Sequence, residues 1–534
     1  MALSERISDS TLASLLAHTA TTDPGRVYLH FQDDEIPVGR VDSDAESLAA
    51  AWANLGVQAG DRIALVLPPR PEFVVSMFAA AKLGAVVVPL SPKASVVDLQ
   101  YMLRQSGASL AVTIERAFGL DYLEIFEDLM PQLPELQYVV TVGEEDLWYD
   151  DRIFQYEDLL SAGAGRDYAP MSGDDRSAAD DTFAFVYTSG TMGKAKAVEL
   201  SHANLLAAAD GTARGLELTA EDRVIGVSAL FHVFGLAPGL LSTLLSGASI
   251  VLQEDGSAGA TLDDIERSGA TVHYGIPTLF VAELEEQRKD PRDLTSLRLA
   301  LIAGAPVGDE LIDDLGERFD VSVVTAYSLT ETASTATMTR PTDSDEKRRF
   351  TVGRPVPGTE IRILGPGGDP LPVESVGQIR IKGPGVMRGY YRQPRETTGA
   401  FDADGFLLTG DLGILDEDGY LHLVGRTKDV IIRSGFNVYP REVEARIESH
   451  PAVREVAVLG IADSLLGEAI CACVVPVEGA IVSEPEILDW CRETLAEAKV
   501  PDLVQFWDEL PRTDTGKLQR GELTRRIKAE RHSS

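Results

Sequence analysis

The chain has 534 residues, which is too long for one ordinary hydrophobic core, so we expect two or more domains. It carries 84 acidic and 48 basic residues, a formal net charge of −36. This balance argues against a nucleic-acid partner, which needs a basic footprint, and against binding to an anionic membrane surface. The three cysteines show no metal-ligand spacing and no disulfide framework, which fits a reducing compartment.

The start of the chain lacks the basic-then-apolar order of a signal peptide. The uncharged run 224–252 is long enough to be considered as a membrane span. Glycines, His232 and Pro238 interrupt it, however, and a strand, a bend, a buried helix and a second strand explain it better. We therefore expect a cytoplasmic protein without an integral membrane span.

The first half of the chain alternates strand-like and helix-like segments. Residues 62–68 form a short β-rich run, 71–85 resemble a buried helix that ends at a glycine, and a further strand follows. Additional strand-like runs are 108–114, 136–142, 298–306 and 321–328. This order predicts βαβ units on a parallel sheet, with ligands bound at the carboxyl ends of its strands.

The character of the sequence changes near Gly353. Dense glycines and prolines there indicate short antiparallel strands and turns. After residue 440 an amphipathic helix, two strands (453–461 and 469–477) and another helix suggest a small α+β domain. We therefore predict an α/β protein with a large N-terminal domain at 1–425, built of βαβ sheets and a small β-rich subdomain, and a small C-terminal domain at 426–534.

One loop is rich in groups that bind phosphate. The stretch TSGTMGKAKAVELSH (188–202) follows a strand-like run and precedes a helix-like run, with two glycines, two lysines and several hydroxyl residues. Backbone N–H groups of such a loop between a strand and a helix can surround phosphates. The loop is not a Walker loop, and taken alone it is also compatible with an ordinary surface loop.

Four further motifs follow in the sequence. They are AYSLTE (326–331), LLTGDLG (407–413), GRTKDVIIRSGFNVYPREVE (425–444) and LPRTDTGKLQR (510–520). In this order and at these distances, the five motifs resemble the adenylate-forming superfamily of acyl-CoA synthetases, peptide-synthetase adenylation domains and beetle luciferases. The resemblance covers nearly the whole chain, and segment 425–444 is most similar to the fatty-acyl-CoA synthetases. It implies an acid–thiol ligase that uses ATP, Mg²⁺ and coenzyme A.

The resemblance assigns roles around the phosphates. Thr330 would contact the α-phosphate region, Glu331 would hold Mg²⁺, and Lys517 would bridge the carboxylate and the α-phosphate as charge develops. The loop over the β- and γ-phosphates would comprise Thr188, Ser189, Gly190, Thr191, Gly193 and Lys196. Met192 stands where the family usually has a hydroxyl residue, so we expect a weaker grip on ATP, and Met192→Thr should lower the KM for ATP.

The resemblance also assigns roles around the nucleoside and the thiol. Tyr327 would stack on adenine, although a plain core position is the alternative, and Asp411 would accept from the ribose hydroxyls beside Arg426. The other face of the base would be lined by Gly304, Ala305 and Pro306. The small domain would swing about Lys428, unless that residue is an ordinary linker charge, and would bring Gly435 and Phe436 to the thiol tunnel.

Segment 229–239 (ALFHVFGLAPG) matches the acyl-pocket segment of the family. It lacks the aspartate that enzymes for α-amino acids place there, so we expect a fatty or other apolar acid. His232 would gate the pocket or lie near the acid, unless it is a packed histidine.

Two alternatives stay open. A separate carrier protein could replace coenzyme A as the acceptor. The protein could also bind nucleotide without turnover, because Met192, Ala195, Ala197, Ser328 and Phe406 depart from the usual motifs.

Overall fold

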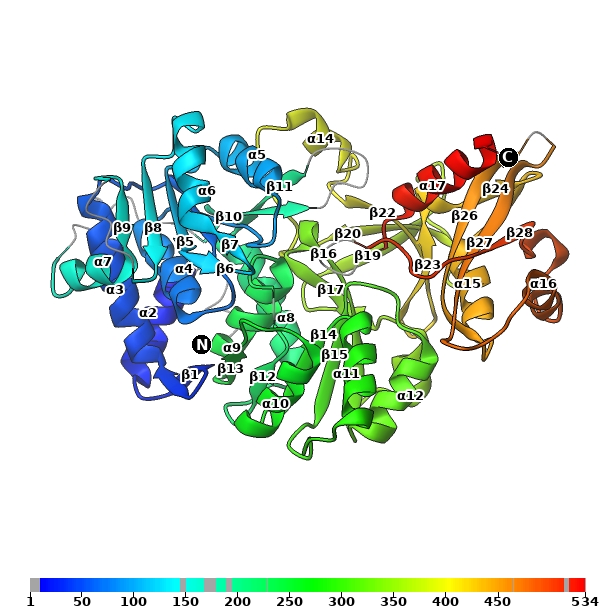
Figure 1. Ribbon diagram of the computed structural model, residues 1–534, viewed down its shortest axis with the longest axis horizontal. Helices are drawn as coiled ribbons and strands as arrows, with labels where there is room; N and C mark the ends of the chain where they lie inside the picture. The colour runs from blue at the N-terminus through cyan, green and yellow to red at the C-terminus, as the bar shows by residue number, and fades with distance from the viewer. Residues whose placement is uncertain are drawn as a thin grey trace.

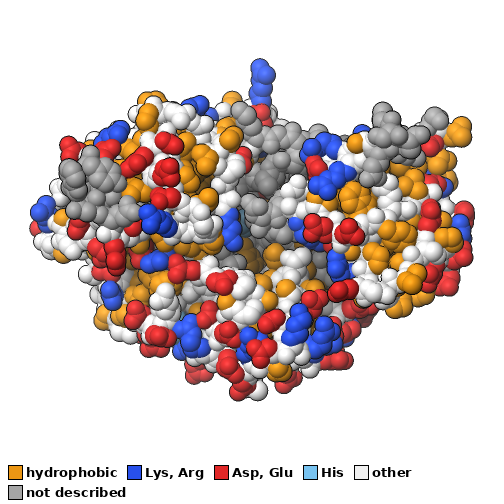
Figure 2. Space-filling model, viewed as in Figure 1, with side chains coloured by type: hydrophobic (Ala, Val, Ile, Leu, Met, Phe, Trp, Pro, Cys, Tyr) orange, Lys and Arg blue, Asp and Glu red, His pale blue; other side chains and the backbone are white. Residues whose placement is uncertain are grey.

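The computed structural model describes residues 10–144, 150–167, 179–188, 195–227, 229–463, 465–512 and 518–533. Figure 1 shows a larger lobe, in which the described chain begins, and a smaller lobe at the opposite end of the long axis, in which it ends. Acidic side chains are spread among basic ones over the face in Figure 2, so the strong negative charge is not gathered in one patch of that face.

The first sheet of the larger lobe is mostly parallel. Its strand order is β21-β11-β10-β4-β3-β5-β8-β9, and each neighbouring pair from β10 to β9 is parallel. The strands are β3 (Arg62–Val66), β4 (Val86–Pro89), β5 (Leu110–Ile114), β8 (Tyr138–Val142), β9 (Ile153–Gln155), β10 (Thr182–Thr188), β11 (Lys196–Ser201) and β21 (Gly389–Tyr390). The helices of this half are α2 (Leu12–Thr22), α3 (Val38–Asn54), α4 (Pro71–Leu83), α5 (Val96–Ser106), α6 (Tyr122–Leu129) and α7 (Tyr156–Gly163).

The helix expected at 71–85 is α4, and its ends follow local chemistry. Pro71 occupies the first helical position, where its missing N–H costs nothing. Gly84 ends the helix with φ 68°, a left-handed conformation that glycine adopts without strain. Residues 73–81 of α4 are all buried, as its apolar sequence predicts.

The second sheet is parallel through its centre. Its order is β18-β17-β16-β15-β14-β12-β13-β1-β2, with parallel pairs from β16 to β1. The strands are β1 (Val27–Phe31), β2 (Asp34–Pro37), β12 (Arg223–Ile225), β13 (Ser249–Leu252), β14 (Val272–Gly275), β15 (Leu299–Ala303), β16 (Ser322–Leu329), β17 (Ser334–Met338) and β18 (Arg354–Pro355). The helices of this half are α8 (His202–Gly215), α9 (Ser242–Ser246), α10 (Ala258–Ser268), α11 (Pro277–Lys289), α12 (Asp309–Arg318) and α13 (Asp345–Phe350), with the π-helix η2 (Gly235–Leu241).

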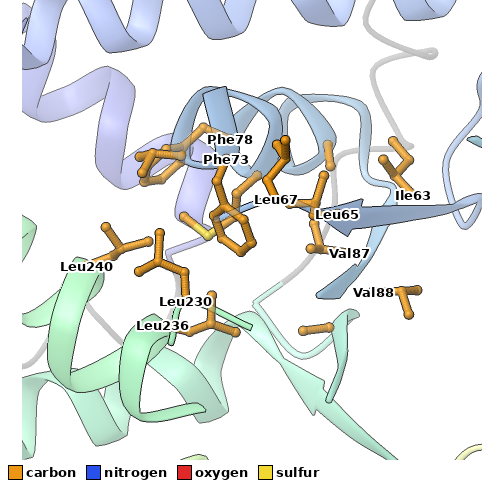
Figure 3. Packing of buried hydrophobic residues seen from close by; sticks show 14 of the residues in the cluster. Ile63, Leu65, Leu67, Phe73, Phe78, Val87, Val88, Leu230, Leu236 and Leu240 are labelled. Atoms are coloured by element: carbon orange, nitrogen blue, oxygen red, sulfur yellow. The ribbon is translucent and has the colours of Figure 1, made fainter. Parts of the chain in front are cut away.

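A single core joins the two sheets. Figure 3 shows Phe73 and Phe78 of α4 facing Leu230, Leu236 and Leu240 from the second half, and all five side chains are at most 1% exposed. Burial of each such side chain contributes about 1.5–3 kcal/mol relative to full exposure. The two βαβ halves are therefore one body, and the prediction of a large domain built of such units is confirmed.

The uncharged run 224–252 folds as the sequence suggested. It supplies β12, the π-helix η2, α9 and β13, all within the larger lobe. None of the helices among the described residues combines the length and the apolar character needed to cross a membrane.

Two smaller sheets follow. The first is antiparallel, with β19 (Glu360–Leu364), β20 (Gly377–Lys382), β22 (Leu407–Leu415) and β23 (Leu421–Arg426), and α14 (Pro394–Gly399) lies between β20 and β22 in the chain. The second contains β24 (Ile431–Arg433), β25 (Phe436–Val438), β26 (Val453–Asp463), β27 (Gly467–Pro476) and β28 (Leu503–Phe506), with α15 (Pro440–Glu448), α16 (Glu484–Arg492) and α17 (Arg520–Ser533). The chain passes from one sheet to the other after Arg426, just beyond the boundary proposed at 425/426.

Candidate active site

The glycine-rich loop connects two antiparallel strands. Thr188 ends β10 and is paired in register with Lys196, the first residue of β11. The expectation of a loop that leads straight into a helix was wrong, because β11 stands between the loop and α8. Ser189, Gly190, Thr191, Met192 and Gly193 lie outside the described residues.

Helix α5 holds both ends of this loop. The Tyr187 hydroxyl donates to the Met102 carbonyl at 2.9 Å and to Gln105 Oε1 at 2.6 Å, one residue before the end of β10. The Tyr101 hydroxyl donates to the Ala195 carbonyl at 3.2 Å, one residue before β11. The residues on both sides of the loop are thus hydrogen-bonded to the same helix.

Glu331 and Lys196 meet around one aromatic ring. Glu331 lies in the short 3-10 helix η3 (Thr330–Thr332), directly after β16, and accepts a hydrogen bond at 2.9 Å from the Tyr390 hydroxyl. The Lys196 ammonium lies 4.6 Å from the centroid of the same ring. The Glu331 carboxylate and the Lys196 ammonium therefore contact the same tyrosine ring, and Thr330 beside Glu331 is largely buried. Tyr390 was not identified from the sequence.

A second group joins three strands. The Tyr327 hydroxyl, on β16, donates to Asp411 Oδ2 at 2.5 Å, and Arg426 Nε lies 3.0 Å from Asp411 Oδ1. Asp411 is on β22 and is paired in register with Arg426 on β23. Burial raises the pKa of the Asp411 carboxyl, although Arg426 and the Tyr327 hydroxyl oppose the rise.

The ring of Tyr327 is buried as well. Only 6% of the residue is exposed, and it belongs to a cluster with Ile361, Ile379 and Leu421. Burial, followed by the Asp411 charge, raises the pKa of its hydroxyl well above the usual value, so the hydroxyl remains a donor. The hydrogen bond to Asp411 was not anticipated from the sequence.

Gly304, Ala305 and Pro306 are exposed at the carboxyl end of β15. Because Ala303 is paired with Ala326 on β16, these residues lie at the same sheet edge as Tyr327. Gly304 has φ 88°, a left-handed conformation suited to glycine. This edge holds the strand ends at which a parallel sheet binds its ligands.

His232 lies at the entrance to an apolar segment. Its Nδ1 accepts from the Phe234 N–H at 3.4 Å, and the chain continues into η2, which contains Pro238. π-Helical turns are frequent at functional sites, and Pro238 lacks the N–H of a regular helix. The Phe234 ring packs against Tyr274 with centroids 5.6 Å apart. Apart from His232, segment 229–239 thus consists of glycine and of aromatic and aliphatic residues.

The small lobe carries the remaining candidates. Lys428 lies in η4 (Thr427–Asp429), between the two smaller sheets, and burial lowers the pKa of its ammonium. Gly435 (φ 83°) lies in the turn of the β24–β25 hairpin, and Phe436, which is 62% exposed, is the first residue of β25. Lys517 lies outside the described residues.

The segments that flank Lys517 are well anchored. Arg512 and Leu518 form a β-bridge, and Arg520 Nη2 lies 2.6 Å from Glu444 Oε1. The Arg520 guanidinium also lies 3.9 Å from Asp429 at the proposed hinge. The chain around the expected catalytic lysine is thus tied to the segment about which the small domain would swing.

Sheet-edge loops, a carboxylate beside a lysine, and a separate small α+β lobe are the features expected of an adenylate-forming enzyme. A family model described as AMP-binding enzyme matches residues 16–391, and another, described as AMP-binding enzyme C-terminal domain, matches residues 442–517. The first match spans more than half of the chain, so the chain belongs to the AMP-binding enzyme family.

Individual relatives narrow the class. The chain is similar to the feruloyl-CoA synthase of Amycolatopsis sp., with 35% identity over 516 residues, 96% of this chain and 97% of the relative. It is similar in structure to the anthranilate CoA ligase AuaEII in complex with anthranoyl-AMP, with a TM-score of 0.90 and 27% identity over 100% of both chains. It is also similar to o-succinylbenzoate CoA synthetase (MenE) from Bacillus subtilis in complex with ATP and magnesium ion, with a TM-score of 0.80, 30% identity, and coverage of 95% of this chain and 98% of that one. The prediction of an AMP-forming acid–thiol ligase is confirmed.

Proposed function

We propose that the protein activates an apolar carboxylic acid with ATP and Mg²⁺ and transfers the acyl group to coenzyme A, releasing pyrophosphate and AMP. The observation that carries the choice of acid is segment 229–239. It continues into the buried helix η2 and contains no carboxylate that could pair with the ammonium group of an amino acid. A buried, unpaired ammonium would be costly, so the pocket favours acids without one.

The chain's own residues supply charge and position for the first step. An acid carboxylate must attack the α-phosphate of ATP, so positive groups must offset two negative charges. Lys196, at the anchored end of the loop, would face the outer phosphates, and Lys517 would bridge the carboxylate and the α-phosphate. Asp411 would orient the ribose, with its own carboxylate fixed by Tyr327 and Arg426.

The donor set fits a magnesium ion. Mg²⁺ is usually held by one or two carboxylates together with substrate phosphates and water, rather than by a full protein cage. Glu331 offers a half-buried carboxylate, and no group of three or more His, Cys, Asp or Glu side chains with the geometry of a metal site occurs in the described part of the chain. Bound there, the ion would neutralise phosphate charge and orient the departing pyrophosphate.

The acceptor is a separate proposal. Three basic residues could have met the phosphates of coenzyme A, but each is paired within the small lobe: Arg433 with Asp502, Arg441 with Glu448 and Lys499 with Glu442. For recognition of the thiol arm we propose the hairpin that carries Gly435 and Phe436. The three free cysteines are buried, and we place the reaction in a reducing compartment such as the cytoplasm.

Discharge of the acyl-adenylate tests the acceptor. The enzyme is loaded with ATP and an apolar acid, freed of excess nucleotide, and mixed with coenzyme A or with a purified phosphopantetheinylated carrier protein. We expect rapid thioester formation with coenzyme A, and formation with the carrier protein only would overturn this choice. Faster pyrophosphate release with α-amino acids than with their deaminated counterparts would overturn the choice of acid.

A further inference from the structure

Tyr390 lies between two charged groups to which the proposed function gives different tasks. It belongs to the short strand β21, which is paired antiparallel with β11 so that Tyr390 stands opposite Val198. Side chains two positions apart on a strand share one face, so Lys196 is a diagonal neighbour of Tyr390 on the same face. This register places the Lys196 ammonium 4.6 Å from the centre of the ring.

The hydroxyl end of the same side chain contacts Glu331. The phenol donates a hydrogen bond to Glu331 Oε1 at 2.9 Å. A phenol hydroxyl is a neutral donor, so this contact adds no charge to the site. It satisfies one carboxylate oxygen without cancelling the negative charge.

The backbone around Tyr390 is fixed from several sides. The Met387 N–H donates to the Glu331 carbonyl at 2.8 Å, which ties this segment directly to η3. The Tyr390 N–H donates to Thr397 Oγ1 at 2.9 Å, within α14. These two contacts fix the backbone at Tyr390, and the hydrogen bond to Glu331 orients its ring.

We propose that Tyr390 is a positioning residue that keeps Glu331 and Lys196 apart, so that the carboxylate is available to Mg²⁺ and the ammonium to the phosphates. This inference rests on the proposed function of the two charged residues. Among the described residues, neither Glu331 nor Lys196 has an ion-pair partner within 4.0 Å, although both contact the Tyr390 ring. A direct pair would neutralise both groups and withdraw them from the ligands. A neutral phenol stabilises the Glu331 carboxylate through its hydroxyl and the Lys196 ammonium through its π-face. Neither charge is neutralised, so both remain available to the ligands.

Measurements of metal binding and of nucleotide binding test the hydroxyl and the ring of Tyr390 separately. Tyr390→Phe removes the hydroxyl and keeps the ring, whereas Tyr390→Leu removes both. Mn²⁺ replaces Mg²⁺ as the probe: free Mn²⁺ is followed by electron paramagnetic resonance in the presence of a saturating non-hydrolysable ATP analogue. Affinity for the metal-free analogue is measured by calorimetry.

For Tyr390→Phe we expect Mn²⁺ affinity to fall about 10-fold, at the lower end of the effect of a hydrogen bond to a charged group, with unchanged affinity for the metal-free analogue. Tyr390→Leu should lose both affinities, because Lys196 can then pair with Glu331. Tyr391→Phe is the matched control, since Tyr391 contacts Phe185 through its ring and Ala197 through its backbone. It should bind both ligands as the wild type does.

Wild-type Mn²⁺ affinity in Tyr390→Phe would overturn the inference, and so would an equal loss in Tyr391→Phe. A second readout adds kinetics: Tyr390→Phe should raise the Mg²⁺ concentration for half-maximal activity with little change in kcat at saturating Mg²⁺. Each of the two proposals can be refuted without refuting the other. If the wild type releases no pyrophosphate with any acid, the proposed function fails, whereas the binding measurements still decide the role of Tyr390.

Discussion

Replacement of Tyr327 by phenylalanine would test how Asp411 is prepared for the nucleotide. The change removes one hydroxyl from a buried ring and leaves the packing against Ile361, Ile379 and Leu421 intact. Asp411 then keeps Arg426 and loses the 2.5 Å hydrogen bond from the phenol. Because Asp411 is only 6% exposed, water cannot easily replace that donor.

The size of the effect follows from this geometry. A hydrogen bond to a charged group contributes about 1.5–3 kcal/mol, and loss of the donor should destabilise the large domain by about that amount at pH 8. Burial already raises the pKa of Asp411, and removal of the hydrogen-bond donor should raise it further. The hydrogen bond favours the carboxylate, so the destabilisation should shrink as the pH falls and Asp411 becomes protonated.

ATP binding by calorimetry and urea unfolding at pH 8 and pH 5.5 measure both consequences. Tyr420→Phe is the matched control, because the Tyr420 hydroxyl donates to Asp343 at 2.7 Å in another tyrosine–aspartate bond. Both variants should lose stability, but only Tyr327→Phe should bind ATP more weakly. The loss of ATP affinity should be about 4- to 12-fold if half of the lost hydrogen-bond energy acts through the ribose contact. Unchanged ATP affinity in Tyr327→Phe, or an equal loss in Tyr420→Phe, would refute the proposed link between Asp411 and the ribose.

Other positions give further expectations. His202 is 1% exposed and accepts the Leu12 N–H at Nδ1, and burial lowers its pKa to about 4. The neutral imidazole stabilises the fold above pH 6.5, and this stabilisation is lost as the pH falls toward 4. The free energy of unfolding of the wild type should therefore exceed that of His202→Asn by about 2 kcal/mol less at pH 5 than at pH 7.5, and a constant difference would contradict this. His273 and Glu283 form a fully buried pair 2.7 Å apart. Glu283→Leu should lower the free energy of unfolding by about 3–5 kcal/mol, and the double variant His273→Leu/Glu283→Leu should recover most of that loss. A loss below about 1 kcal/mol in Glu283→Leu would count against this expectation. Lys517→Ala should abolish acid-dependent pyrophosphate release, and full activity would show that its proposed role is wrong. Lys428→Pro should spare pyrophosphate release and slow thioester formation, whereas equal loss of both steps would count against a hinge there.

Local sequence patterns predicted the large elements of the fold. The buried helix at 71–85 and the strands expected at 62–68, 108–114, 136–142, 298–306 and 321–328 follow from apolar runs broken by glycine and proline, because each of these signals lies within a few residues. Strand β11 was missed, although Val198 and Leu200 alternate with the half-buried Glu199. Its six residues stand between a loop and a strong helix signal, and a strand this short is stabilised mainly by its neighbours β10 and β21.

The contacts of the site that the sequence did not predict join residues far apart in the chain. Tyr390 meets Glu331 across 59 positions, and Tyr327 meets Asp411 across 84. Such contacts arise from strand register between distant segments, which no short motif encodes. The motifs identified which chemical groups belong to the site, whereas the fold is needed to show what holds each group in place.

Acid-dependent pyrophosphate release is the most direct measurement of the proposed chemistry. The purified protein is incubated with ATP, Mg²⁺ and a panel of fatty, aryl and α-amino acids, with and without coenzyme A. We predict release with at least one apolar acid, multiple turnovers and a thioester product when coenzyme A is present, and no release without acid. Absence of release with every acid of the panel would contradict the assignment of this site to the activation of a carboxylic acid.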